Sequence, residues 1–234
     1  MKRGVLMLGI FLAVAQGHDI ITTAITFDRE ITRIFQARCF SCHREGGSAF
    51  SLLTYSDARP WAEAIKEEVL ARRMPPWGAV KGFGDFRNDQ ALTPEQLELI
   101  ESWADGGVPE GEPTDLPPPA TYTTASPVSR PHGAVDVSGD FKLDRAFTLD
   151  GLLPATVPEK STLKITAEFP DGSVEPLLWL EDYKAQYGHL FLLRTPLELP
   201  AGTMIRGVPV EAKVSLLPPS SVVSPPPQTG PEGR

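Results

Sequence analysis

The sequence predicts an α+β protein of two domains, a small all-α domain followed by an antiparallel β-sandwich. Residues 26–106 carry apolar side chains at helical spacing and contain clear helix-start signals. From residue 133 onward, short apolar or alternating runs are separated by turn residues, with no helical period between them, which is typical of antiparallel sheets. Residues 111–130 are rich in proline, threonine and serine and predict a linker.

Residues 1–17 have the layout of a secretory signal peptide. Lys2 and Arg3 precede an apolar run from Val5 to Val14, and small residues follow it. The run is too short to span a bilayer comfortably, and an uncleaved membrane anchor is the alternative interpretation. We therefore expect an exported protein, periplasmic or otherwise extracytoplasmic, with no membrane-spanning segment after cleavage.

The charge balance of the chain is acidic. It has 22 Lys and Arg side chains against 30 Asp and Glu, for a net charge of −8. This balance argues against nucleic acid and anionic membrane surfaces as partners, and it favours solubility and a basic partner.

The first helix is expected over residues 26–38. Its apolar residues recur at helical spacing, and Thr26 or Asp28 can cap its start. The glycine-rich stretch over residues 44–51 predicts a loop, so the residues between helix and loop are presented directly from a helix end.

Those residues read Arg38-Cys39-Phe40-Ser41-Cys42-His43-Arg44, with two cysteines three apart followed at once by a histidine. This spacing suits a c-type haem, because the thiols add to its two vinyl groups while the imidazole of His43 binds the iron from one side. Cys39 and Cys42 are the only cysteines in the chain. We expect one covalent haem c, held by these two thiols and ligated by His43.

Three other interpretations compete for this motif. Tetrahedral zinc needs four ligands, yet the remaining histidines, His18, His132 and His189, are scattered along the chain. A thioredoxin-type redox pair expects an adjacent strand-helix-strand pattern, which the sequence does not show. The third alternative is a structural disulfide. We favour haem because the motif is specific and follows an export signal.

A second helix is expected to begin near Ser56, with Pro60 in its first turn. Trp61, Ile65 and Val69 repeat every four residues and predict its buried face. Two consecutive prolines end this helical stretch.

Met74 is the expected sixth ligand of the haem iron. Apart from Met204, far along the chain, it is the only methionine beyond the signal peptide. Pro75 and Pro76 are expected to hold it in an extended, rigid segment, which a weak thioether ligand needs. The alternative is a methionine that fills the core.

The third helix has the clearest signals. Thr93-Pro94-Glu95-Gln96 is a capping box with proline at the first helical position, and Gly106-Gly107 ends the helix. Trp103 lies on its apolar stripe and is expected to be a core residue that packs on the first helix.

Two residues near Met74 are candidate contacts of the haem edge. Trp77 could pack on the ring or donate to a propionate, and Arg73, with Arg72, could neutralise a propionate. Ordinary packing of Trp77 and solvated arginines are the alternatives.

The order of helix, Cys-x-x-Cys-His, Met-Pro-Pro-Trp and capped closing helix resembles a class I type cytochrome c. More closely, three phrases resemble cytochrome domains fused to bacterial copper type II, ascorbate-dependent monooxygenase-like domains. These are Ser51-Leu52-Leu53-Thr54-Tyr55, Ala58-Arg59-Pro60-Trp61-Ala62 and Arg73-Met74-Pro75-Pro76-Trp77. The resemblance implies a cytochrome c domain over residues 18–110. Those relatives place a proline before the phenylalanine that follows the glycine loop, whereas this chain has Ala49-Phe50. The carbonyl that accepts the proton of the outer nitrogen of His43 therefore stays open.

Beyond the linker, a sandwich is expected over residues 131–217. Its expected strands are Gly133–Leu143, Ala146–Leu149, Thr162–Phe169, Val174–Leu180, Gly188–Arg194 and Thr203–Val214. Asp171-Gly172 is a ready hairpin turn. Residues 218–234 predict a disordered or extended proline-rich tail.

The second half also resembles the C-terminal sandwich of the same monooxygenase-like family, through Phe169 to Leu178 and Tyr187 to Thr203. A mononuclear copper site needs several converging imidazoles, and this half has only His132 and His189. Where the resemblance places a histidine-bearing segment, the chain reads Leu153-Pro154-Ala155-Thr156-Val157-Pro158. We expect that the copper site is lost.

Together these features predict an exported monohaem c-type cytochrome that carries single electrons, an electron-transfer protein rather than an enzyme. Its sandwich would dock to a redox partner, such as a membrane respiratory or photosynthetic complex. Two alternatives stay open. One is a haem-fed copper monooxygenase-like oxidoreductase, which needs a further ligand near His132 and His189, and the other is a structural subunit of a larger redox assembly.

Overall fold

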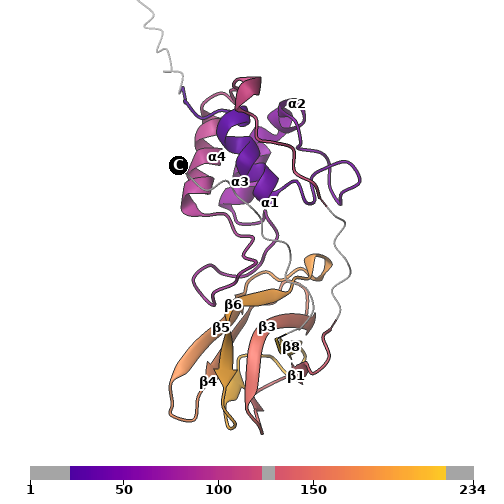
Figure 1. The fold of residues 1–234 in the computed structure, drawn as a ribbon, viewed down its shortest axis with the longest axis vertical. Coiled ribbons are helices and arrows are strands. Elements are labelled where there is room, and N and C mark those ends of the chain that lie inside the picture. Colours follow the sequence, from indigo (N-terminus) through magenta and orange to yellow (C-terminus); the bar gives the residue numbers. More distant parts are fainter. Residues whose placement is uncertain (1–21, 123–129, 220–234) are drawn as a thin grey trace, which may run out of the picture.

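The computed structural model describes residues 22–122 and 130–219. The expected signal peptide, part of the linker and nearly all of the expected tail lie outside these ranges. The described chain has mixed α+β structure, with short helices in its first half and two antiparallel sheets in its second (Figure 1). Within the described residues, no helix has the length and apolarity that crossing a membrane requires.

The helical part contains seven short elements. In chain order they are η1 (Phe27–Ile31), α1 (Thr32–Arg38), α2 (Tyr55–Ala58), η2 (Arg59–Trp61), α3 (Ala62–Leu70), α4 (Pro94–Asp105) and η3 (Pro113–Asp115). The expected first helix is confirmed, and it opens as the π-helical turn η1 with Thr26 as its N-cap. The predicted capping box of α4 is also confirmed, because Thr93 Oγ1 accepts from the Gln96 amide at 3.2 Å and Gln96 Oε1 accepts from the Thr93 amide at 3.0 Å.

The second helix begins earlier than expected and is interrupted. Thr54, not Ser56, is the N-cap, and it forms a capping box with Asp57. Pro60 falls in the 3₁₀ turn η2, which separates α2 from α3. Trp61 therefore does not join the buried face of α3: its side chain is 46% exposed and stacks on Phe50, with ring centroids 4.8 Å apart.

Trp103 is a core residue, as expected. It is fully buried, its ring meets Phe27 and Phe35 at centroid distances of 6.0 and 6.3 Å, and its Nε1 donates to the Pro109 carbonyl at 3.0 Å. These contacts tie α4 to the N-terminal helix and complete the core of the helical part.

The first part of the expected linker packs on the helical part. Tyr122 Oη donates to the carbonyl of Gln36 at 3.0 Å, and Gln36 Nε2 donates to the carbonyl of Pro118 at 2.9 Å. The chain between Gly111 and Tyr122 is therefore ordered against α1 by contacts that composition alone does not predict.

The second half forms two four-stranded antiparallel sheets, which together we call the sandwich. One sheet has the order β1-β8-β3-β6 and the other β2-β7-β4-β5. The strands are β1 (Val135–Val137), β2 (Phe141–Lys142), β3 (Phe147–Thr156), β4 (Leu163–Glu168), β5 (Val174–Leu180), β6 (Phe191–Leu199), β7 (Met204–Arg206) and β8 (Lys213–Leu217). A buried core of leucine, isoleucine and valine side chains from both sheets lies between them.

The hairpin turn at Asp171-Gly172 is confirmed. Gly172 has a φ of 85°, and the Phe169 amide donates to the Ser173 carbonyl at 2.8 Å. Two expected strands are each divided in two. The run Gly133–Leu143 contains β1 and β2, and the run that begins at Thr203 contains β7 and β8. In each pair the two strands join different sheets. The expected short strand that ends at Leu149 continues to Thr156 as β3, through the segment where the resemblance placed histidines.

The core of the sandwich is completed by the loop between α3 and α4. We call residues 76–91 the connecting loop. Its residues Trp77 and Phe86 are only 4% and 5% exposed and belong to the sandwich core. Ala79 forms a β-bridge with Leu180 of β5, and Phe86 forms one with Leu193 of β6. Since β5 and β6 are edge strands of the two sheets, the connecting loop joins both edges.

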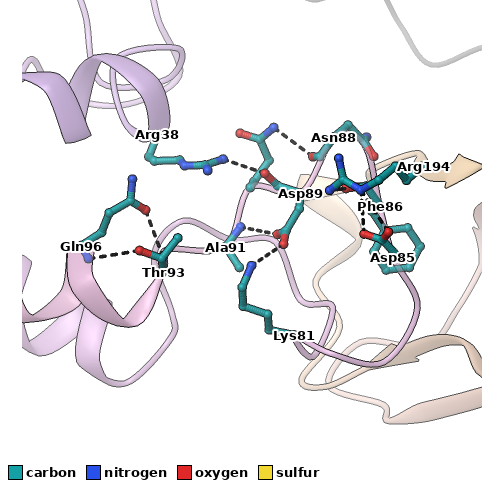
Figure 2. A network of polar contacts seen from close by, with 11 residues as sticks. Arg38, Lys81, Asp85, Phe86, Asn88, Asp89, Ala91, Thr93, Gln96 and Arg194 are labelled. Carbon is teal, nitrogen blue, oxygen red and sulfur yellow. Dashed lines mark hydrogen bonds and ion pairs between the residues drawn. The ribbon is translucent and has the colours of Figure 1, made fainter. Parts of the chain in front are cut away.

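Polar contacts tie the second half of this loop to both parts of the molecule (Figure 2). Toward the sandwich, Arg194 Nε donates to Asp85 at 3.0 Å, and Asn88 Nδ2 donates to the Leu190 carbonyl at 2.7 Å. Toward the helical part, Arg38 at the end of α1 donates to the Asp89 carbonyl at 2.6 Å. The loop thus packs on both halves of the molecule at once.

Candidate functional site

A cavity of about 300 Å³ lies beside the end of α1 and is lined by both halves of the molecule. Its lining residues are Arg38, Cys39, Cys42, His43, Ser48, Ala49, Val69, Met74, Pro75, Pro76, Gln186 and Tyr187. The two cysteines, the histidine and the methionine of the expected haem site therefore border one cavity. We call it the ligand cavity.

The two cysteines occupy the turn in which α1 ends. The Cys39 amide donates to the Phe35 carbonyl at 2.7 Å, and the Cys42 amide donates back to the Cys39 carbonyl at 3.1 Å. The cysteines are not joined in a disulfide. Burial raises the pKa of the Cys39 thiol to about 12, and the neighbouring Cys42 contributes in the same direction. Cys39 is therefore a neutral thiol at physiological pH.

His43 has one ring nitrogen engaged by the backbone. Its Nδ1 lies 3.0 Å from the carbonyl oxygen of Phe50. Since a carbonyl only accepts, Nδ1 carries the proton and Nε2 keeps its lone pair. Burial lowers the pKa of His43, opposed in part by this hydrogen bond. The question that Ala49-Phe50 raised is thus answered: the acceptor is the carbonyl of Phe50.

The glycine loop makes this contact possible by turning sharply over the motif. A Cβ atom at Gly47 would lie 2.1 Å from the carbonyl oxygen of Cys42, so no larger residue fits there without a shift of the backbone. Just beyond it, the Ala49 amide donates to that same Cys42 carbonyl at 3.2 Å. Phe50 is thereby placed over the ring of His43, edge to face, at 5.0 Å between centroids.

Met74 reaches the ligand cavity from the end of α3. The chain reverses through Arg72, which has a φ of 56°, and the Met74 amide donates to the Glu68 carbonyl at 3.2 Å. The chain bends at Met74 and Pro75, so the expectation of an extended segment is wrong. Backbone contacts with α3, rather than extension alone, place this thioether.

Arg38 is the only lysine or arginine among the residues that line the ligand cavity. One terminal nitrogen is used by the Asp89 carbonyl. Its Nε atom is buried and has no hydrogen-bond partner within the described parts of the chain. A buried donor without a partner is costly, so this guanidinium suits an acidic group in the cavity.

Trp77 and Arg73, the expected haem-edge contacts, do not line the ligand cavity. Both border a larger neighbouring cavity of about 710 Å³. Trp77 packs in the sandwich core, 4.7 Å from the ring of Phe191. Arg73 makes two hydrogen bonds of 2.8 Å to Glu68, and Arg72 borders the same larger cavity. The sequence pointed to these residues by proximity to Met74, whereas the cation at the cavity is Arg38.

The two histidines of the sandwich are far from equivalent. His132 is exposed. His189 lies in the turn before β6, not within a strand as expected, and its Nε2 donates to the carbonyl of Pro76 at 2.9 Å. Burial lowers the pKa of His189. Across residues 22–122 and 130–219, no group of three or more His, Cys, Asp or Glu side chains is placed to hold a metal ion.

Gln186 and Tyr187 are cavity residues that sequence reasoning missed. They belong to η4 (Ala185–Tyr187), a 3₁₀ turn between β5 and β6. No motif marks them, because their place at the cavity depends on how the sandwich meets the helical part.

No protein-family model, curated protein or solved structure matches this chain. The function proposed below is therefore argued from the residues that border this cavity.

Proposed function

We propose that this chain is an extracytoplasmic monohaem c-type cytochrome that carries single electrons. The observation that carries the proposal is that Cys39, Cys42, His43 and Met74 border one cavity, although three of them come from one end of α1 and the fourth from the end of α3. A c-type haem would be held through thioethers to the two cysteines, with His43 Nε2 and Met74 Sδ as its iron ligands. Such a group supplies a one-electron redox centre.

The surrounding residues support this assignment. The Phe50 carbonyl fixes the ring of His43 with Nε2 available for a metal and makes that nitrogen a better donor. Val69 and Pro75 give the cavity apolar walls. Arg38 would balance a propionate, which is the acidic group that its unpartnered Nε suits.

The helical part would then be a cytochrome c domain of the class I type. In this proposal α1 presents the attachment motif, α3 leads into Met74, and α4 closes the domain by packing Trp103 on Phe27. The sandwich would dock to a basic redox partner, in agreement with the net charge of −8. A membrane respiratory or photosynthetic complex is the class of partner that we propose.

The test uses the protein exported from a host that attaches c-type haem. We expect covalently retained haem in the purified wild type and its loss in the Cys39→Ala, Cys42→Ala double variant. In Met74→Ala, we expect a lower reduction potential and carbon monoxide binding to the reduced protein, because a coordination site is opened. Met204→Ala is the matched control, since Met204 is half-buried in β7 of the sandwich.

Three outcomes would contradict all or part of the proposal. A wild type that retains no haem would reject the cytochrome, and a Met74→Ala protein with unchanged spectrum and potential would exclude Met74 as a ligand. Stoichiometric copper binding that disappears when His132 or His189 is replaced would favour the copper oxygenase instead.

A further inference from the structure

The backbone that follows Met74 is part of the sandwich. His189 Nε2 donates to the Pro76 carbonyl at 2.9 Å, two residues after Met74. The next residue, Trp77, is buried between His189 and Phe191, at centroid distances of 5.2 and 4.7 Å. The position of Met74 is therefore bounded on one side by α3 and on the other by the sandwich.

The sandwich also supplies a wall of the ligand cavity. Gln186 and Tyr187 line it from η4. They are far from the attachment motif in the sequence, yet they border the same cavity. The start of η4 is held within the sandwich, because the Ala185 amide donates to Glu159 at 2.8 Å. Tyr187 and Met74 border both the ligand cavity and the larger neighbouring cavity, so they lie on the partition between the two.

We propose that the sandwich positions Met74 for iron ligation and that His189 is the positioning residue. This inference rests on the proposed function above. A thioether is a weak, neutral ligand, so its occupancy at the iron depends on how well the protein holds it in place beforehand. The hydrogen bond from His189 fixes the first backbone carbonyl beyond Met74-Pro75, and it does so from the other half of the molecule.

The chemistry of His189 defines the variants that separate positioning from packing. Its Nε2 must carry the proton, because the Pro76 oxygen only accepts. A glutamine side chain places an amide donor near the same point, whereas leucine or alanine offers none. His189→Gln should therefore retain the contact, and His189→Leu should lose it. His132→Leu is the matched control, since His132 is an exposed histidine of the same sandwich.

The experiment measures iron ligation in each haem-loaded variant. The readouts are the charge-transfer absorption band of methionine-ligated ferric haem, the reduction potential and carbon monoxide binding to the reduced protein. We expect His189→Leu to lose or weaken the band, to fall in potential and to bind carbon monoxide. We expect His189→Gln and His132→Leu to match the wild type. Thermal unfolding of each variant measures stability separately.

The outcomes distinguish this inference from the proposed function. A wild type without the methionine band would reject Met74 as a ligand and, with it, the positioning role. A wild type with the band that His189→Leu leaves unchanged would reject the positioning role alone, even where the variant unfolds at a lower temperature. Should His189→Leu not accumulate, His189→Ala adds no bulk and gives the same reading.

Discussion

At the scale of single residues, Arg38 is the cavity side chain with the most to gain from a bound acidic group. Its Nε is buried and has no partner within the described residues, and Arg38 lines the same cavity as Cys39 and His43. We predict that Arg38→Gln retains covalent haem but has a lower reduction potential, because a positive charge near the iron favours the reduced state. Spectroelectrochemical titration of wild type and variant measures the shift.

Arg73 supplies the matched control for this prediction. Its guanidinium is committed to Glu68 and borders only the larger cavity. Arg73→Gln should leave the potential close to that of the wild type, since an exposed, paired charge is well screened. The opposite result is a shifted reduction potential in Arg73→Gln and none in Arg38→Gln. It would indicate that Arg73, the residue expected from the sequence, contacts the propionate.

Asp28 is a buried carboxylate whose ionisation works against the fold. It is 4% exposed. Burial raises the pKa of Asp28, and the carboxylates of Glu110, Asp115 and Glu112 raise it further. Its charged form is therefore less favourable in the folded than in the unfolded chain, so stability falls as pH rises through the window above the ordinary aspartate pKa of about 3.9.

We predict that Asp28→Asn raises the thermal unfolding temperature at neutral pH and that the gain disappears at a pH below that window. Asp171→Asn should behave oppositely, because hydrogen bonds from Ser173 lower the pKa of Asp171 and make its charged form the favoured one in the fold. Scanning calorimetry of the three proteins at neutral and acidic pH measures both effects. A gain in Asp28→Asn that persists at acidic pH would contradict the electrostatic cause.

At the scale of elements, the connecting loop carries two arginine–aspartate pairs that differ in burial. Arg87 donates to both carboxylate oxygens of Asp150 in β3, at 2.9 and 2.8 Å, and Asp150 is 9% exposed. Arg87→Ala leaves that buried carboxylate uncompensated. We predict a loss of about 2 kcal/mol in the free energy of unfolding, less than for a fully buried pair because the Arg87 side chain is partly exposed.

The second pair, Arg194 with Asp85, is the control. Its side chains are 61% and 71% exposed, and it joins the same loop to β6. We predict that Arg194→Ala costs less than about 1 kcal/mol, as for other exposed ion pairs. Chemical denaturation of both variants, fitted with a common slope, measures the difference. Equal losses would mean that burial does not decide the strength of these pairs.

The sequence predicted elements well where the signal was local. The Thr93-Gln96 box, the Gly172 turn and the fully buried Trp103 each follow from residues within a few positions of one another. Thr54 and Asp57 form a box of the same kind, which the choice of Ser56 as N-cap passed over. The division of two expected strands between opposite sheets could not be read, because alternation marks a strand without saying which sheet it joins.

The same contrast between local and distant signals holds for the candidate site. Cys39, Cys42 and His43 share one turn, and the Phe50 carbonyl is only seven residues from His43, so a local motif and its loop define this side of the cavity. The sequence around Trp77 is equally compatible with a haem contact and with a place in the sandwich core. Its partners His189 and Phe191 come more than a hundred residues later, and no sequence period links such distant positions.

At the scale of the whole molecule, the core of the sandwich is completed by residues from the first half of the chain. Trp77 and Phe86 come from between two helices, yet both are buried in the sandwich. We predict that a fragment of residues 130–219 alone is largely unfolded, since truncating a buried aromatic side chain typically costs about 3–5 kcal/mol, against about 5–15 kcal/mol for the stability of a whole domain.

Circular dichroism and dye binding to exposed apolar surface measure this directly. The same sandwich within the intact chain, carrying only Arg194→Ala, is the folded comparison. A fragment that unfolds cooperatively, at a temperature near that of the intact protein, would show that the connecting loop is an addition to a sandwich already complete.

The place of Tyr187 on the cavity wall has a consequence for the order of events during biosynthesis. In the export that we propose, the attachment motif emerges first, whereas Gln186 and Tyr187 follow after more than half of the chain. Until that late segment arrives, one wall of the cavity does not exist, and Cys39 and Cys42 stand open on that side. Under the proposed function, chain order thus provides an interval in which haem can reach both cysteines before the sandwich completes the cavity wall.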